Sequence, residues 1–272
     1  MRIVRYSRVG PPGRGVVIGD DVYELPSDST EPGDLVGPVS GLALLPPCEP
    51  RTIVCAAANY AGQLAEKGMP HPDHPSFFLK SPNAVSAPNS VILRPAEVTR
   101  LEYEGELAVV IGRTARAVPP DRAADYILGY TCANDVTAHD FRADGQWTRA
   151  KSADTFCPLG PWIETTVADP ATLRITTRLN NKVVQKESTS DMVFDVAELL
   201  AYITRWITLQ PGDILLTGSP AGVGPMTPGD LVEVEISGIG TLRNTVVGQG
   251  ASEPSTRAGR PEPSSYEASR IS

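Results

Sequence analysis

Glycine and proline interrupt this chain so often that short strands are favoured over long helices. The chain has 24 Gly and 26 Pro, and these separate β-type runs at 51–56, 90–93, 107–111, 173–179, 214–217 and 231–236. Three stretches favour helices instead, at 60–67, 121–128 and 195–204. Because strands dominate and helices do not alternate regularly with them, we predict a strand-rich α+β fold.

Three parts of different composition follow one another along the chain. Residues 1–48 are expected to form a small N-terminal β-rich domain, which contains a hairpin and ends at Pro46-Pro47. Residues 49–250 hold most of the predicted strands and helices and form the main domain. Residues 251–272 are rich in Ser and Pro and poor in bulky apolar side chains, so we expect a disordered tail whose removal changes neither stability nor activity.

Charge and composition exclude several classes of partner. The formal net charge of −8 argues against nucleic acid. No apolar run reaches the roughly 18 to 20 residues of a membrane span, and the N-terminus lacks a secretory pattern, so we expect a cytoplasmic protein with no membrane partner. The cysteines lack metal-binding spacing and there are only three histidines, so any metal should be bound by oxygen.

The segment 101–112 places acidic residues at alternate positions before a continuous apolar run. In a strand, Glu102, Glu104 and Glu106 would share one face with the apolar residues that follow them. Carboxylates that enter a core together repel one another and lose hydration, so a positive group is needed among them. A divalent cation meets this need, with Mg²⁺ or Mn²⁺ favoured and Ca²⁺ as a further option. The alternative is an edge strand with a solvated acidic face.

Three more features supply polar groups for such a site. Asp135 ends a β-type run and is a candidate third ligand, although Asn-Asp is also an ordinary turn. Lys151 follows Trp147 and precedes a turn, where a surface lysine is the alternative. The glycine-rich segment 217–224 lacks the Lys-Ser/Thr ending of a nucleotide-binding loop. Its backbone N–H groups suit another anionic ligand.

Taken in order, these motifs resemble those of the fumarylacetoacetate hydrolase family. The matching segments lie between about residues 50 and 247 and are Asn59-Tyr60, 104–112, 134–138, 151–152, 158–161, 210–213 and 217–224. The resemblance implies a mixed β-sandwich roll, a homodimer, and a Mg²⁺ or Mn²⁺ site made by Glu104, Glu106 and Asp135. It also implies a small-molecule substrate, a 2-oxo acid or its enol, that chelates the metal.

The same resemblance assigns roles to other side chains. Lys151 matches a catalytic lysine beside the metal, and Gln63 and Glu66 stand at the catalytic lid positions where the family usually has His-x-x-Glu. His139 stands where many members have a substrate-orienting arginine, and Arg142 follows three residues later. The substrate contacts implied in this way are Tyr60, His139, Arg142, Thr189, Gly218 and Ser219.

The lid departure bears on the reaction. An amide cannot act as a base near neutral pH, so only Glu66 titrates on the predicted lid. Hydrolysis of a C–C bond needs a base that activates water, whereas decarboxylation and enol–keto isomerisation do not. We therefore predict a divalent-metal-dependent enzyme of 2-oxo acids or enols, with lyase or isomerase chemistry favoured unless His139 reaches the water site. The alternatives are a repurposed member that makes a specialised metabolite from a 1,3-dicarbonyl, and a non-catalytic binder.

Overall fold

A computed structural model describes residues 1–26, 29–142 and 145–250 of the chain. The predicted tail at 251–272 lies outside the described residues. Strands predominate in the described part, which contains three sheets and three short α-helices. The strand-rich α+β prediction is confirmed.

The largest sheet contains twelve strands, which are β1 (Arg2–Tyr6), β2 (Gly13–Ile18), β3 (Asp21–Glu24), β4 (Leu35–Pro38), β5 (Leu44–Leu45), β6 (Ile53–Ala57), β7 (Ser76–Lys80), β8 (Val85–Ser86), β11 (Gly105–Ile111), β12 (Ile127–Asn134), β14 (Cys157–Glu164) and β17 (Ile214–Leu216). Its path runs β4-β3-β2-β1-β14-β12-β11-β17-β6-β7. Strand β5 pairs with β1, and β8 pairs with β14. Neighbours are antiparallel except in the β17–β6 and β14–β8 pairs.

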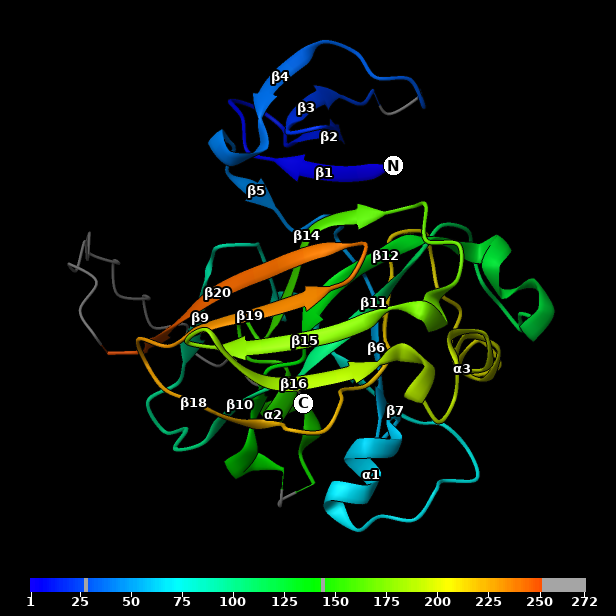
Figure 1. Ribbon diagram of the computed structural model, residues 1–272, viewed down its shortest axis with the longest axis vertical. Coiled ribbons are helices and arrows are strands. Elements are labelled where there is room, and N and C mark those ends of the chain that lie inside the picture. The colour runs from blue at the N-terminus through cyan, green and yellow to red at the C-terminus, as the bar shows by residue number, and fades with distance from the viewer. Residues whose placement is uncertain (27–28, 143–144, 251–272) are drawn as a thin grey trace, which may run out of the picture.

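Two smaller sheets complete the main body. One has the order β16 (Lys182–Ser188), β15 (Arg174–Leu179), β19 (Leu231–Ile236), β20 (Gly240–Gly248) and β9 (Val91–Arg94). It packs over β11, β12 and β14, as Figure 1 shows. The other has the order β13 (Thr137–Ala138), β10 (Leu101–Tyr103) and β18 (Gly224–Met226). The predicted mixed sandwich is therefore present.

Strand β11 lies between two apolar clusters. Leu107, Val109 and Ile111 join the cluster under the five-stranded sheet. Ala108 and Val110 join the cluster on the opposite face. Every residue of β11 is buried and the strand lies between β12 and β17, so it is an interior strand rather than an edge strand. This excludes the solvated acidic edge considered above.

The helices are short, as the frequent glycines and prolines predict. They are α1 (Ala61–Lys67), α2 (Trp147–Lys151) and α3 (Val196–Ile203). In α3, Asp195 and Glu198 form a capping box. The helix predicted at 121–128 is wrong in type and extent, because a 3₁₀ helix covers Pro120–Tyr126 and Ile127 already belongs to β12. Pairing of β12 with β11 prevails over the local helical pattern.

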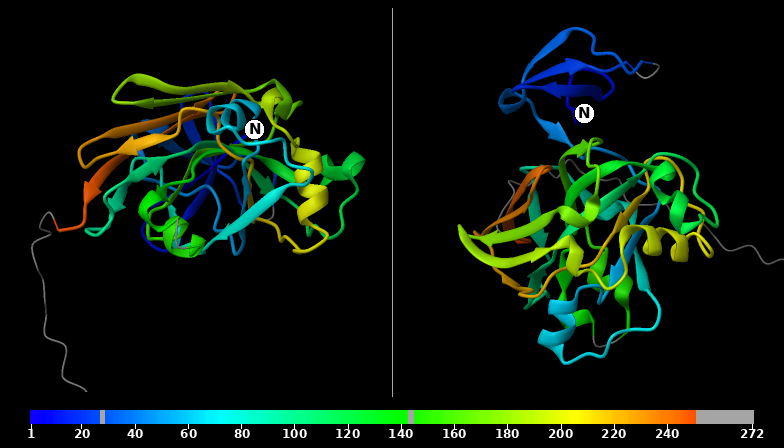
Figure 2. Two further views of the ribbon diagram at one scale, coloured as in Figure 1. Left: turned by 90° about the horizontal axis from the view of Figure 1, so that it is seen from below. Right: turned by 45° about the vertical axis from the view of Figure 1, so that its right-hand side comes forward.

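The N-terminal strands stand apart from the main body (Figures 1 and 2). They have their own apolar cluster around Val4, Tyr6 and Val22. Strand β1 joins them to the main body by pairing with β14, where Arg2 lies opposite Glu164. A domain boundary at residue 48 stays a prediction. None of the helices in the described ranges is long and apolar enough to cross a membrane.

Candidate metal centre

The start of β11 brings three carboxylates together. Antiparallel pairing puts Gly105 opposite Asn134, so Asp135 follows directly beside Glu104. The Asp135 N–H donates to the Glu104 carbonyl at 2.8 Å, and the Asn134 side-chain oxygen accepts the Glu104 N–H at 2.9 Å. A side chain at Gly105 would place its Cβ 2.2 Å from the Thr177 hydroxyl, so only glycine fits there.

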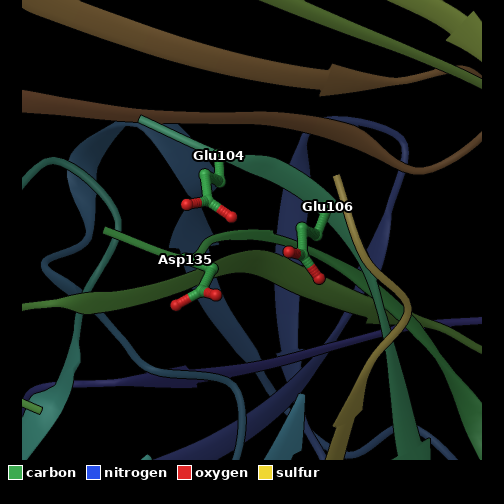
Figure 3. Close-up of side chains that lie close together, drawn as sticks. All are labelled: Glu104, Glu106 and Asp135. Carbon is green, nitrogen blue, oxygen red and sulfur yellow. The ribbon is translucent and has the colours of Figure 1, made fainter. Parts of the chain in front are cut away.

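The side chains of Glu104, Glu106 and Asp135 converge in this place, as Figure 3 shows. One oxygen from each of them lies within 4.8 Å of the others, and all three residues are buried. Glu102 lies outside this group of three. The strand is interrupted at Glu104, and Glu102 belongs to β10 in a different sheet.

Two buried lysines neutralise part of this charge. Lys151, in α2, donates to Asp135 at 2.6 Å and to Glu104 at 3.1 Å. Lys80, at the end of β7, donates to the other oxygen of Asp135 at 2.5 Å. Sequence reasoning missed Lys80. The sequence did offer one sign that Lys80 is buried. In strand β7, Lys80 shares a face with the apolar Phe78.

Burial and charge act on these groups in different directions. Burial, with the Asp135 and Glu104 charges, raises the pKa of Glu106 well above its usual value. Burial also opposes the charged form of Asp135, but Lys151 and Lys80 outweigh it, so the pKa of Asp135 is lowered. The pKa of Lys151 is raised, because Asp135 and Glu104 overcome its desolvation. Three carboxylates face two lysines, so one negative charge is left over.

This donor set fits a hard divalent cation. All three candidate ligands are carboxylates, which suit Mg²⁺, Mn²⁺ or Ca²⁺. Among the described residues, Glu104 Oε2 and Glu106 Oε1 accept no hydrogen bond, so both oxygens are available to an ion. A cation would also offset the burial and the neighbouring Asp135 and Glu104 charges, which together raise the pKa of Glu106.

The glycine-rich loop, residues 218–222, binds anions that belong to the chain itself. The N–H of Gly218 donates to Glu106 at 2.7 Å. The N–H of Ala221 donates to Glu187 at 3.2 Å, and that of Gly222 donates to both oxygens of Glu66 at 3.1 and 3.2 Å. The loop N–H groups, which were predicted to suit an anionic ligand, thus bind three glutamates of the chain, and these come from three different elements.

The lid positions lie on α1. Gln63 is buried, whereas Glu66 is exposed and holds the loop at Gly222. The hydroxyl of Tyr60, just before the helix, is buried without a hydrogen-bond partner in the described structure, and burial beside the Glu106 charge raises its pKa. Lys67, at the end of α1, was not singled out from the sequence. Burial lowers its pKa while the nearby Glu104 acts against that shift.

Other predicted substrate residues have partners within the chain. His139 Nδ1 lies 3.1 Å from Glu102, which also pairs with Arg100. The Arg142 guanidinium lies 5.4 Å from the centre of the Trp147 ring. Within the described ranges, neither His139 nor Arg142 forms a hydrogen bond or ion pair with the three carboxylates, so their substrate roles stay predictions.

Two predicted hydroxyl contacts are engaged in holding the backbone or neighbouring side chains. Thr189 both accepts from the Leu173 N–H and donates to its carbonyl, each at 3.0 Å. Ser219 accepts a hydrogen bond from Gln185 at 2.8 Å. The geometry does not bring Thr189 to the carboxylates, whereas Ser219 follows Gly218, which contacts Glu106 directly. The sequence alone did not show that Ser219 lies next to a residue that contacts the carboxylates and that Thr189 does not reach them.

Comparisons with known proteins agree with one another. The model of the fumarylacetoacetate (FAA) hydrolase C-terminal family matches residues 52–247. Oxaloacetate tautomerase FAHD2A, mitochondrial, from Bos taurus is 40% identical over 216 residues, which are 75% of this chain and 69% of that protein.

Solved structures show the same likeness. The 5-carboxymethyl-2-hydroxymuconate delta-isomerase from Mycobacterium smegmatis is 41% identical with a TM-score of 0.83, over 92% of this chain and 100% of that one. Maleylpyruvate hydrolase from Sphingobium sp. SYK-6, in complex with manganese(II) and pyruvate, is 32% identical with a TM-score of 0.78, over 91% and 99%.

Proposed function

The chain belongs to the fumarylacetoacetate hydrolase family of enzymes, and we propose that it is a divalent-metal-dependent isomerase that interconverts the keto and enol forms of a 2-oxo acid. One observation carries the choice of isomerisation over hydrolysis. The lid helix α1 offers Gln63 and Glu66, and Glu66 already accepts the Gly222 N–H. Among the described lid residues there is no imidazole to activate water.

Glu104, Glu106 and Asp135 would hold the metal, with Mg²⁺ or Mn²⁺ favoured. When bound there, such an ion would supply Lewis-acid chemistry for a 2-oxo acid. Lys151 keeps a buried positive charge beside these ligands and favours the negative charge that develops in an enolate. Lys80 holds Asp135 ionised and in place from the other side.

Keto–enol isomerisation transfers one proton from carbon 3 to the 2-oxygen and breaks no C–C bond. It needs a group that takes and returns a proton but no attacking water. We assign that proton transfer to Glu66, the carboxylate of the lid beside the loop that contacts Glu106. Gln63 then contributes orientation only, since an amide neither gains nor loses a proton near neutral pH.

The relatives support this substrate class. The activities named for the relatives above are oxaloacetate tautomerase, 5-carboxymethyl-2-hydroxymuconate delta-isomerase and maleylpyruvate hydrolase, and the maleylpyruvate hydrolase structure holds pyruvate, a 2-oxo acid. We therefore propose a small 2-oxo acid or its enol as the substrate. Decarboxylation uses no attacking water either, and a separate measurement of released CO₂ in the same reaction mixture identifies it.

The test follows the enol absorbance of oxaloacetate after mixing with the protein and Mg²⁺ or Mn²⁺. We expect accelerated loss of the enol, abolished by EDTA. Metal ions also act on oxaloacetate in solution, so Glu106→Gln at the same metal concentration is the matched control. Equal rates for wild type and Glu106→Gln, or rapid cleavage of an acylpyruvate by wild type, contradict the proposal.

We also propose that the enzyme is a cytoplasmic homodimer, as the sequence and its family resemblance predict. Light scattering on the purified full chain measures its assembly, and a mass of one chain contradicts the dimer. Fractionation of the producing cells measures its location, and recovery with the membrane fraction contradicts a cytoplasmic protein.

A further inference from the structure

Glu187 of β16 lies outside the carboxylate group and outside the set of residues predicted from sequence. We propose that Glu187 is a positioning residue that fastens the lid helix α1 to the glycine-rich loop 218–222. Through that loop it helps to fix Glu106, and it keeps the lid over the site. The activity part of this inference rests on the proposed function, whereas its structural part does not.

The carboxylate of Glu187 bridges two segments that are far apart in sequence. One oxygen accepts the Gly62 N–H of α1 at 3.1 Å, and the other accepts the Ala221 N–H of the loop at 3.2 Å. Glu66, near the other end of α1, accepts from Gly222 of the same loop. The lid is thus attached to one loop at two points, and Glu187 supplies one of them.

The loop transmits this attachment to the metal centre. Its first residue, Gly218, donates to Glu106 at 2.7 Å. Gln185, two residues before Glu187 and on the same strand face, donates to Ser219 and to the Pro220 carbonyl. The oxygen of Gln185 also accepts the N–H of Gly105, which lies between Glu104 and Glu106. Strand β16 therefore holds the loop and the ligand strand together.

Both α1 and the loop approach strand β16 closely, at two glycines. A Cβ added at Gly62 would lie 2.6 Å from one Glu187 oxygen, and one added at Gly222 would lie 2.1 Å from the Val184 carbonyl. Gly218 adopts φ +93°, a conformation that side chains disfavour. Moving α1 away from the loop must therefore break a Glu187 contact, because this carboxylate accepts N–H groups from both segments. Loss of that contact should weaken substrate retention before it affects the chemical step.

The experiment compares Glu187→Gln with Lys186→Gln, its exposed neighbour on the opposite strand face. A glutamine at 187 keeps the shape but accepts only one of the two N–H groups with its single oxygen. We expect the KM for oxaloacetate to rise about tenfold, which is the worth of one charge-assisted hydrogen bond, while kcat changes by less than about threefold. Lys186→Gln should leave both unchanged. A purely structural role would lower the active fraction without moving KM.

Two measurements on substrate-free protein test the inference without turnover. In Glu187→Gln, amide hydrogen exchange should accelerate in 61–67 and 218–222, with no such change in α3. Gly62→Ala should accelerate the same exchange in wild type but much less in Glu187→Ala, where the clashing carboxylate is gone. Equal effects of Gly62→Ala in both backgrounds, or unchanged exchange in Glu187→Gln, overturn the positioning role.

These outcomes separate the two proposals. If wild type shows no turnover of 2-oxo acids but Glu187→Gln still loosens α1 and the loop, the proposed function fails and the attachment stands. If wild type turns over oxaloacetate and Glu187→Gln changes neither KM nor exchange, the attachment fails and the proposed function stands.

Discussion

The two ends of the site are built from different interactions. At the metal end, Asp135 and Glu104 pair with buried lysines, so ionic groups face ionic groups away from water. At the lid end, Glu66 and Glu187 accept backbone N–H groups near the surface. The metal end holds the charged groups that a metal-dependent reaction requires, whether that reaction is isomerisation, decarboxylation or hydrolysis. The lid end determines which proton transfers are available, so the reaction type depends on it.

The largest effect is expected at the metal end. Glu106→Gln removes one of three candidate ligands while its amide oxygen still accepts the Gly218 N–H. We expect turnover to fall at least about 10³-fold, because several kcal/mol of charge stabilisation are lost. Calorimetric titration with Mn²⁺ should show lost binding.

The same variant also tests stability without metal. Since folding raises the pKa of Glu106, metal-free Glu106→Gln should be at least as stable as wild type, and a clear loss of its stability in EDTA would contradict this account.

Lys80→Met tests whether the metal end depends on paired charges. The Lys80 and Asp135 side chains are 0% and 1% exposed, so the variant leaves a buried carboxylate with one partner fewer. We expect the metal-free protein to lose about 3–5 kcal/mol of unfolding free energy in urea denaturation. Mn²⁺ should recover part of this loss, since a cation compensates Asp135. The exposed Lys182→Met serves as the control, and equal losses in the two variants would refute the assignment.

Gln63→His tests the lid end by restoring an imidazole. General bases contribute about 10²–10⁴-fold, and we expect acylpyruvate hydrolysis to rise by about 10², because Glu66 is held by Gly222 and pairs poorly with the new ring. Gln63→Asn should not gain hydrolysis. A wild-type hydrolysis rate that already equals that of Gln63→His would show that another group, such as His139, supplies the base.

The smallest effect is the pH dependence that arises at the metal end. The folded pKa of Glu106 is raised above its usual 4.5, so its contribution to the metal-free protein is favourable at low pH and is lost as the pH rises toward that raised pKa. The pKa of Asp135 is lowered below 3.8, so its contribution is present above 3.8 and is lost as the pH falls through the lowered value.

Melting curves with and without Mn²⁺ measure how the Glu106 contribution to stability changes with pH. From about pH 5 to pH 7, the Tm gap between the Mn²⁺-loaded and metal-free proteins should widen, because the ion removes the cost of ionising Glu106. Glu66→Gln should leave the widening intact, whereas Glu106→Gln should remove it. A gap that narrows with pH in wild type would reverse the sign and contradict the assignment.

The sequence predicted the metal end better than the lid end for a physical reason. Alternation at 102–106 indicated that glutamates share a face, and the family resemblance implied the set Glu104, Glu106 and Asp135. The pairing of β11 with β12 brings these three together in the structure. Lys80 arrives from a distant strand, so no local pattern placed it beside Asp135. Glu187 meets Gly62 across 125 positions, and only the packed structure shows that contact.

Helix prediction failed where strand pairing outweighed local preference. Residues 121–128 have a helical pattern, but Ile127 is paired with Ile111 and belongs to β12. By contrast, the capping box of α3 agrees with its apolar face, so local and tertiary preferences coincide at 196–203. Short elements between prolines are the ones for which tertiary pairing decides.

The central claim is that the metal end is a complete metal-dependent centre while the lid end lacks a base for hydrolysis. Proton NMR in D₂O, with Mg²⁺, oxaloacetate and an acylpyruvate in one sample, tests both halves together. We expect wild type to exchange the carbon 3 protons of oxaloacetate at least about 10² times faster than Glu106→Gln while the acylpyruvate stays intact. Cleavage of the acylpyruvate at a comparable rate, or equal exchange by the two proteins, would contradict the claim.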